Sequence, residues 1–237
     1  MPFWSRPQRP AAYAEQALVT AILDGTYPPG STLPGERDLA ALLGVTRPTL
    51  REALQRLERD GWLAINQGKP TRVNDFWRDG GLNVLSGLVR YGRQLPPGFI
   101  THLLQVRLDM APTYTRQAVE RSAAQVAECL AGHTHLDDTP EAYAAFDWHL
   151  HRTLTIASGN PIYTLMLNGF AGFYEQIARL YFARPEARAA SRAFYAHLLA
   201  AAQRGDGPTA EEIARSVMRQ SIDLWGQTER EMGPGLL

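Results

Sequence analysis

The chain has 237 residues, of which 45% are hydrophobic and 20% charged, so it is long enough for one large or two ordinary globular domains. It carries 24 basic and 24 acidic residues, and Lys69 is the only lysine. No stretch is long and apolar enough for a membrane span, and residues 1–10 lack the apolar core of a secretory signal, which predicts a cytoplasmic protein without membrane contact. A single cysteine, Cys129, excludes an internal disulfide.

Short helices are predicted at the start of the chain. Apolar residues at helical spacing favour a first helix over residues 13–24 and a second over 36–43. In the second helix, Leu39, Leu42 and Leu43 are expected to face inward. Glycines follow both helices and favour their ends there.

A third helix is expected to begin after Thr46, whose hydroxyl can cap it. Its apolar positions recur at helical spacing: Leu50, Leu54 and Leu57. This spacing puts Arg47 and Arg51, four residues apart, together on the outer face.

A β-hairpin is predicted after Gly61, because apolar residues then alternate with period two over residues 63–65 and 71–73. Gly68 and Lys69 lie in the intervening turn. Three short helices and a hairpin indicate a winged helix-turn-helix, whose third helix can enter a DNA major groove. An ordinary α+β module with a solvated arginine face is the alternative interpretation.

Strand signals end after residue 81, and helical patterns fill the rest of the chain. They cover residues 82–91, 99–120, 123–130, 140–157, 161–183, 188–202 and 209–229. The predicted fold class is therefore mainly α, with an N-terminal winged helix-turn-helix and an all-α helical bundle. The predicted segments are a flexible N-terminus (1–12), a winged helix-turn-helix DNA-binding domain (13–74), a junction (75–81), an all-helical domain (82–232) and a tail (233–237).

Asp147 and His151 form the best polar cluster of the second domain, because four residues apart on a helix they share one face and suit a divalent metal. Two ligands make a poor metal site, so a polar pair inside the domain is the favoured interpretation. No catalytic motif accompanies the segment from Ser158 to Pro161. Its residues instead predict the end of one helix and the start of the next. We therefore predict neither a catalytic residue nor a cofactor.

One aromatic stripe favours a cavity in the second domain. Its members recur at helical spacing: Phe170, Tyr174, Ile177 and Tyr181. Such a stripe is usually core, but two of its members carry hydroxyls, and Gly169 and Gly172 thin the same region.

Several motifs together resemble the GntR superfamily of regulators. The N-terminal motifs are YPPG at 27–30, LPGERDLA at 33–40, GVTRPTLREAL at 44–54, DGWL at 60–63 and GKPT at 68–71. Further motifs resemble the fatty-acid metabolism regulators within that superfamily: NDFW at 74–77, ASGNPIY at 157–163, LNG at 167–169, YFARPEAR at 181–188 and FY at 194–195. The match extends over nearly the whole chain.

This resemblance implies a homodimer that binds pseudo-palindromic operator DNA, represses fatty-acid degradation genes, activates synthesis genes and is released by long-chain acyl-CoA. The DNA contacts it implies are Arg37, Thr46, Arg47, Thr49, Arg51, Gly68 and Lys69. The ligand contacts it implies are Arg107, Tyr174, Tyr181, Ser221, Trp225 and Arg230. The sequence departs from the pattern at Pro48, Gln67 and Met218, and Arg230 replaces a lysine.

Two alternatives stay open from the sequence. One is a GntR regulator that senses a small carboxylate through a metal at Asp147 and His151. The other is a metal-dependent enzyme on a helical scaffold that binds no DNA.

Overall fold

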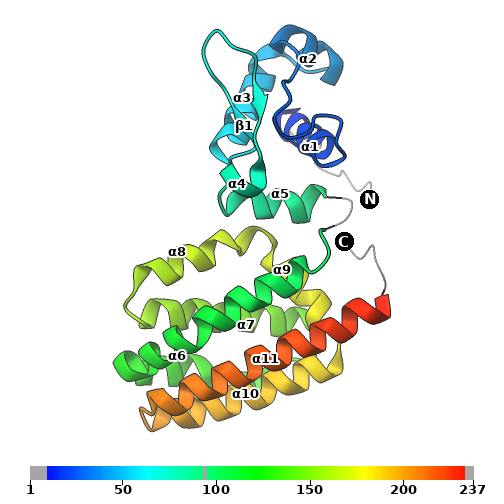
Figure 1. Ribbon diagram of the computed structural model, residues 1–237. Helices are drawn as coiled ribbons and strands as arrows, with labels where there is room; N and C mark the ends of the chain where they lie inside the picture. The colour runs from blue at the N-terminus through cyan, green and yellow to red at the C-terminus, as the bar shows by residue number, and fades with distance from the viewer. Residues whose placement is uncertain (1–9, 93–94, 233–237) are drawn as a thin grey trace, which may run out of the picture. The chain divides into compact units, whose positions relative to one another are not determined.

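The computed structural model describes residues 10–92 and 95–232, which form two compact units that part at residues 93 and 94 (Figure 1). The first unit contains α1 (Pro10–Leu23), α2 (Glu36–Leu43), α3 (Arg47–Arg59), β1 (Leu63–Ala64), β2 (Arg72–Val73), α4 (Phe76–Asp79) and α5 (Asn83–Tyr91). The second contains α6 (Phe99–Ala131), the 3₁₀ turn η1 (Gly132–His135), α7 (Pro140–Ala157), α8 (Pro161–Gly169), α9 (Ala171–Phe182), α10 (Pro185–Gln203) and α11 (Gly207–Met232). The predicted fold class, a winged helix-turn-helix followed by a helical bundle, is confirmed.

The first unit is organised around α3. Its apolar face, Leu50, Leu54 and Leu57, is buried and packs against α1 and α2. Thr46 caps the helix as expected, because its side-chain oxygen accepts a hydrogen bond from the Thr49 backbone N–H. The inward placement of Leu42 is wrong: this side chain is 70% exposed, because Leu39 and Ala40 supply the buried face of the short helix α2.

The hairpin is shorter than the alternation predicts. Leu63 pairs with Val73 and Ala64 with Arg72 in an antiparallel register, and Thr32 adds an isolated bridge to Arg72. The turn between the strands contains Gly68 with a positive φ of 74°, a conformation that glycine adopts at little cost. The predicted wing is present, with its turn exposed.

The segment after the hairpin is part of the first unit. Phe76 of α4 packs on Trp62 with ring centroids 4.9 Å apart, and α5 packs against α1. The sequence-based boundary at residue 82 places α5 in the second domain, whereas the structure places it in the first unit. The predicted N-terminal segment 1–12 overlaps α1, which starts at Pro10, and its remaining residues, like the predicted tail 233–237, lie outside the described residues.

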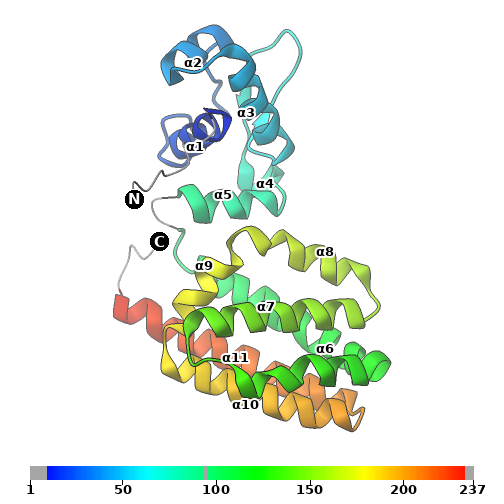
Figure 2. The ribbon, with the colours of Figure 1, turned by 180° about the vertical axis from the view of Figure 1, so that it is seen from behind.

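The long helices α6, α7, α10 and α11 form the body of the second unit (Figures 1 and 2). Helix α6 packs along α11, α7 and α10, and α7 also packs against α8 and α9. The break predicted between residues 120 and 123 is a kink within α6, where Ser122 has φ −147° and ψ 46°. The helix predicted over 161–183 is two helices, because the chain turns at Phe170 directly after Gly169. No helix in the described ranges is long and apolar enough to cross a membrane.

The close packing of α5 on Trp62 gives a stability prediction. A Cβ added at Gly87 would lie 2.6 Å from Cζ2 of Trp62, a ring that is 2% exposed and has little room to move. Overpacking of this kind costs about 1–3 kcal/mol, against about 1 kcal/mol gained by removing a helical glycine. We expect Gly87→Ala to lower the free energy of unfolding in urea denaturation.

Gly81→Ala is the control, because a Cβ there has no neighbour within 4 Å. Equal or higher stability of Gly87→Ala relative to the natural chain would contradict the packing of α5 on Trp62.

Candidate functional site

The expected DNA contacts of the first unit gather on two helices and the hairpin turn. Arg37 lies on α2, and Arg47, Thr49 and Arg51 lie in the first turns of α3, with Thr46 at its cap. The three arginine side chains are exposed, with more than half of the surface of each open to solvent. A recognition helix presents its N-terminal residues to base edges in this way.

The remaining contacts and the two departures in this unit are also exposed. Gly68 and Lys69 lie in the hairpin turn beside Gln67. Pro48 lies in the first turn of α3, where a helix tolerates proline because this N–H has no partner within the helix. The cap at Thr46 forms with Pro48 in place, so the departure leaves the helix start intact.

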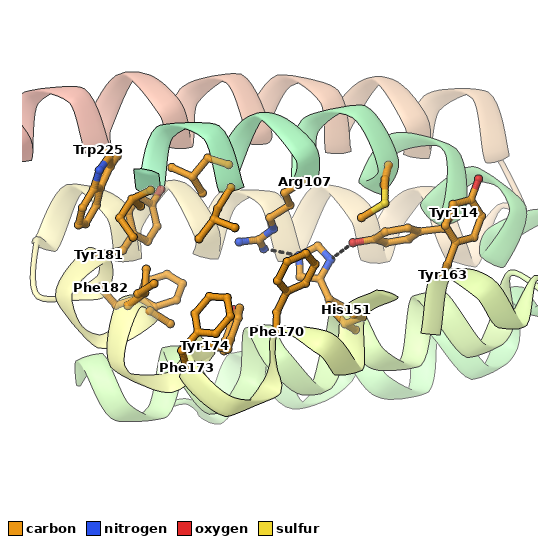
Figure 3. A pocket seen from close by; sticks show the side chains of 17 residues that line it. Arg107, Tyr114, His151, Tyr163, Phe170, Phe173, Tyr174, Tyr181, Phe182 and Trp225 are labelled. Carbon is orange, nitrogen blue, oxygen red and sulfur yellow. Dashed lines mark hydrogen bonds between the residues drawn. The ribbon is translucent and has the colours of Figure 1, made fainter. Parts of the chain in front are cut away.

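The second unit contains a cavity of about 100 Å³, counted as space open to the centre of a water molecule. Its walls are almost entirely aromatic and aliphatic and come from α6, α7, α8, α9 and α11. The complete lining is Ile100, Leu103, Leu104, Arg107, Met110, Tyr114, His151, Tyr163, Leu167, Phe170, Phe173, Tyr174, Ile177, Ala178, Tyr181, Phe182 and Trp225. Figure 3 shows Trp225 and Tyr163 at opposite ends, with Arg107 between them.

The predicted aromatic stripe lines this cavity with all four of its members, Phe170, Tyr174, Ile177 and Tyr181. The cavity interpretation of the stripe is therefore supported over a fully packed core. The turn at Phe170 does not remove this residue from the lining, since it immediately precedes α9.

Arg107 is the cation of the cavity. Its Nη2 donates to Oδ2 of Asp147 at 2.6 Å and to Nε2 of His151 at 2.5 Å, so one nitrogen supplies both hydrogen bonds. Because an arginine only donates, His151 Nε2 accepts and Nδ1 carries the proton. Nδ1 then donates to the Tyr114 hydroxyl at 2.7 Å (Figure 3).

Asp147 is a buried carboxylate with three donors. In addition to Arg107, the Tyr174 hydroxyl donates to Oδ2 at 2.5 Å and the Tyr195 hydroxyl to Oδ1 at 3.2 Å. The polar pair predicted at Asp147 and His151 is thus the centre of a network of six residues, which we call the Arg107 network: Arg107, Tyr114, Asp147, His151, Tyr174 and Tyr195. A buried charge of this kind requires such compensation.

Burial and neighbouring charges fix the protonation states of the network. Burial opposes the charge of Asp147, but Arg107 outweighs it and the pKa of the carboxyl lies below its ordinary value. For Arg107, too, burial is outweighed, here by Asp147, and its pKa is raised. Burial, reinforced by the positive charge of Arg107, lowers the pKa of His151 from 6.5 to about 3. The imidazole is therefore neutral at physiological pH, in agreement with its hydrogen bonds.

The other predicted ligand residues differ in their relation to the cavity. Tyr181 and Trp225 line it, and Ser221 lies behind Tyr181 and accepts from its hydroxyl at 3.1 Å. Arg230 is exposed on α11 and outside the lining. Met218, the departure in this unit, is buried but is also outside the lining.

Trp225 is the one lining residue with a buried, unpaired donor among the described residues. Its side chain is 2% exposed, and its Nε1 has no hydrogen-bond acceptor. Unpaired buried donors are rare in folded proteins. An acceptor on a bound molecule would satisfy this one.

Sequence reasoning missed Tyr114 and Tyr195 as partners of the polar pair and missed Tyr163, Phe173 and Phe182 as lining residues. One signal was available: Arg107 and Tyr114 are seven residues apart, which places them on one face of α6 two turns apart. Nothing in the sequence alone reveals that this face meets α7.

Comparisons with known proteins identify the family of both parts of the chain. The pattern of the family described as bacterial regulatory proteins, gntR family, matches residues 10–73, and that of the FadR C-terminal domain matches residues 74–236. The chain belongs to the GntR family. It is 42% identical over 230 residues to proteins named fatty acid metabolism regulator from Cronobacter sakazakii and Escherichia coli, covering 97% of this chain and 96% of theirs.

Membership in the GntR family decides between a regulator and the metal-dependent enzyme considered from the sequence. The relatives are regulators, so the chain is a transcription regulator of the fatty-acid metabolism group with DNA as a partner, and the enzyme alternative is excluded. The fold is also similar to the solved structure of Lar, a protein that controls the expression of the Listeria monocytogenes agr system. The TM-score is 0.63 at 15% sequence identity, and the match covers 93% of this chain and 98% of that chain. At that identity it supports the fold alone.

The exposed face of α3 gives the first site prediction. Arg47→Ala and Arg51→Ala should each weaken specific DNA binding by about 1–3 kcal/mol if each side chain reads a guanine. Lys69→Ala should weaken binding to all DNA sequences by a similar factor, because a lysine in the hairpin turn contacts phosphates and not bases. Mobility-shift titration at several salt concentrations separates the two effects.

Arg59→Ala is the control, since Arg59 lies at the other end of α3 and pairs with Asp60 at 2.9 Å. Unchanged binding by both arginine variants of the first turns would exclude this face as the reading surface.

The neutral His151 gives a pH prediction. Its pKa is lower in the folded than in the unfolded chain, so the stability it contributes is complete above pH 6.5 and decreases as the pH falls toward 3. Between pH 7 and pH 5 this group alone should remove about 2 kcal/mol from the free energy of unfolding. Urea denaturation of the helical unit at each pH measures the loss.

His151→Gln retains an acceptor and a donor but does not titrate, so its stability should vary less over this range. His135→Gln, at an exposed position, should keep the natural pH dependence. The same pH dependence in His151→Gln and in the natural chain would show that the imidazole is protonated in the folded state.

Proposed function

We propose that the chain represses fatty-acid degradation genes and activates synthesis genes as a cytoplasmic homodimer on pseudo-palindromic operator DNA, and that long-chain acyl-CoA releases it. The observation that carries the proposal is an aromatic and aliphatic cavity with one internal cation, Arg107, and one unpaired donor, Trp225 Nε1. The similarity to regulators named for fatty-acid metabolism supports the same ligand class.

The cavity suits an alkyl chain with a polar acceptor. Burial of methylene groups against aromatic walls provides affinity in proportion to chain length. A thioester carbonyl can accept from Trp225 or from Arg107, whose side chain keeps 24% of its surface exposed. The phosphates of a CoA group require further cations, and the exposed Arg230 on α11 is a candidate for this role.

Release from DNA follows if the ligand disturbs the Arg107 network. The network joins α6, α7, α9 and α10, so a ligand group that competes for Arg107 changes the contacts among four helices. By linkage, a ligand that favours the arrangement unable to bind DNA binds less well when operator is present, by the same factor.

A metal-dependent sensor of small carboxylates is less well supported. The two candidate ligands, Asp147 and His151, each accept a hydrogen bond from Arg107, so a cation is already present between them. Within the described residues no cluster of three or more histidine, cysteine or acidic side chains is suited to a metal. The wide apolar lining also fits an alkyl chain better than a small polar molecule.

Dimerisation is part of the proposal because one small head offers limited contact with DNA. A two-fold symmetric pair of heads reads two half-sites of a palindrome and doubles the interface. One head has a single exposed recognition helix and a single wing, which are the elements needed to read one DNA half-site.

Calorimetric titration with acyl-CoA of different chain lengths tests the proposal. Shortening the chain from sixteen to twelve carbons removes four methylenes, about 3 kcal/mol or roughly two orders of magnitude in affinity. Free CoA should bind weakly, because it lacks the chain. Operator release, measured by fluorescence anisotropy of labelled DNA, should follow the same order of affinities.

Equal affinity for long and short chains, or operator binding that micromolar long-chain acyl-CoA leaves unchanged, would contradict the proposal. Loss of the response on treatment with a metal chelator would favour the metal-dependent sensor instead.

A further inference from the structure

An acidic residue lies among the arginines of the DNA-binding face. Glu36 is the first residue of α2, and its Oε2 accepts a hydrogen bond from Nε of Arg51 at 2.7 Å. The same oxygen lies 3.9 Å from Nη2 of Arg47. Because Glu36 and Arg51 are fifteen residues apart on different helices, only the folded unit brings them together.

Folding stability does not account for this cluster. The side chains of Arg47, Arg51 and Glu36 are 57%, 55% and 37% exposed, and exposed ion pairs contribute little to the free energy of unfolding. A carboxylate on a surface that faces phosphates also weakens electrostatic attraction to every DNA sequence. The position of Glu36 therefore favours selectivity over total affinity.

The atoms involved indicate how selectivity arises. The hydrogen bond from Nε of Arg51 to Glu36 holds one edge of the guanidinium and does not use the outer edge, where each Nη group carries an N–H. Two parallel N–H donors match the O6 and N7 acceptors of guanine. A free arginine, in contrast, has many rotamers and binds any nearby phosphate.

We propose that Glu36 is a specificity-determining positioning residue: it holds Arg51 through Nε, so that the Nη edge of this arginine reads guanine in the operator half-site. Glu36 acts through Arg51 and need not touch a base. This inference rests on the DNA-binding role of α3 and adds to it a residue outside the recognition helix.

Glu36→Gln tests the role, because glutamine has nearly the same shape without the charge. The specific probe is a duplex selected by the natural full-length chain from a random-sequence pool, and the non-specific probe is a scrambled duplex of equal composition. We expect the ratio of specific to non-specific affinity to fall about fivefold or more. The salt dependence of scrambled-duplex binding should steepen by about one unit in the log–log slope, because one repelling charge is removed.

A double-mutant cycle with Arg51→Ala distinguishes positioning from a general charge effect. In the Arg51→Ala background, Glu36→Gln should change the affinity ratio little, since the side chain it positions is absent. The matched control is Glu52→Gln, which removes an equal charge from α3 at a residue that pairs with Arg56 at 2.5 Å. This control should leave the affinity ratio unchanged, and circular dichroism verifies that all variants fold.

Three results would overturn the inference: an unchanged ratio in Glu36→Gln, an equal gain in affinity for both duplexes, or the same fall in ratio with and without Arg51. Failure of the natural chain to select any sequence would instead overturn the proposed function itself, so the two failures are distinguishable.

Discussion

The second unit depends on one electrostatic constraint: a carboxylate, Asp147, lies in an apolar interior and must be neutralised there. Arg107 supplies the opposite charge, and Tyr174 and Tyr195 supply further donors. Buried pairs of this kind add little net stability, but loss of one partner costs about 3–5 kcal/mol. The network is therefore best understood as fixing the relative positions of α6, α7, α9 and α10. Arg107, Tyr114, His151 and Tyr174 also line the cavity, so the proposed ligand would lie where these helices are held together.

The two units use arginine in opposite ways. In the first, Arg47 and Arg51 are exposed in the first turns of α3, and a single carboxylate, Glu36, limits their freedom. In the second, Arg107 is held inside a hydrogen-bonded network and replaces the cation that a metal would supply between Asp147 and His151. Guanidinium geometry suits both tasks, because its donors are planar and permanently charged. A lysine in place of Arg47 or Arg51 would lack the second, parallel donor.

Helix boundaries show where sequence reasoning was sufficient. The helix over 140–157 was predicted with its observed ends, because Thr139 caps its start and Gly159 follows its end. The sequence also indicates an interruption near residue 122, but it does not show that the interruption is a kink within one helix that packs along α11 and α7. The turn at Phe170 was missed, since aromatic periodicity continues through it. Leu42 was misplaced because an eight-residue helix has too few positions to define its buried face.

The sequence by itself determined the order of the elements, the exposed arginines in the first turns of α3, the aromatic stripe and the family, because these depend on local periodicity, caps and contiguous motifs. It also brought Asp147 and His151 together, since one helical turn separates them. Only the tertiary structure decided that Arg107 lies between them and that Tyr114 and Tyr195 complete their hydrogen bonds. It likewise decided that Glu36 reaches Arg51. These contacts join different helices, and their existence depends on which faces pack together, which no local pattern specifies.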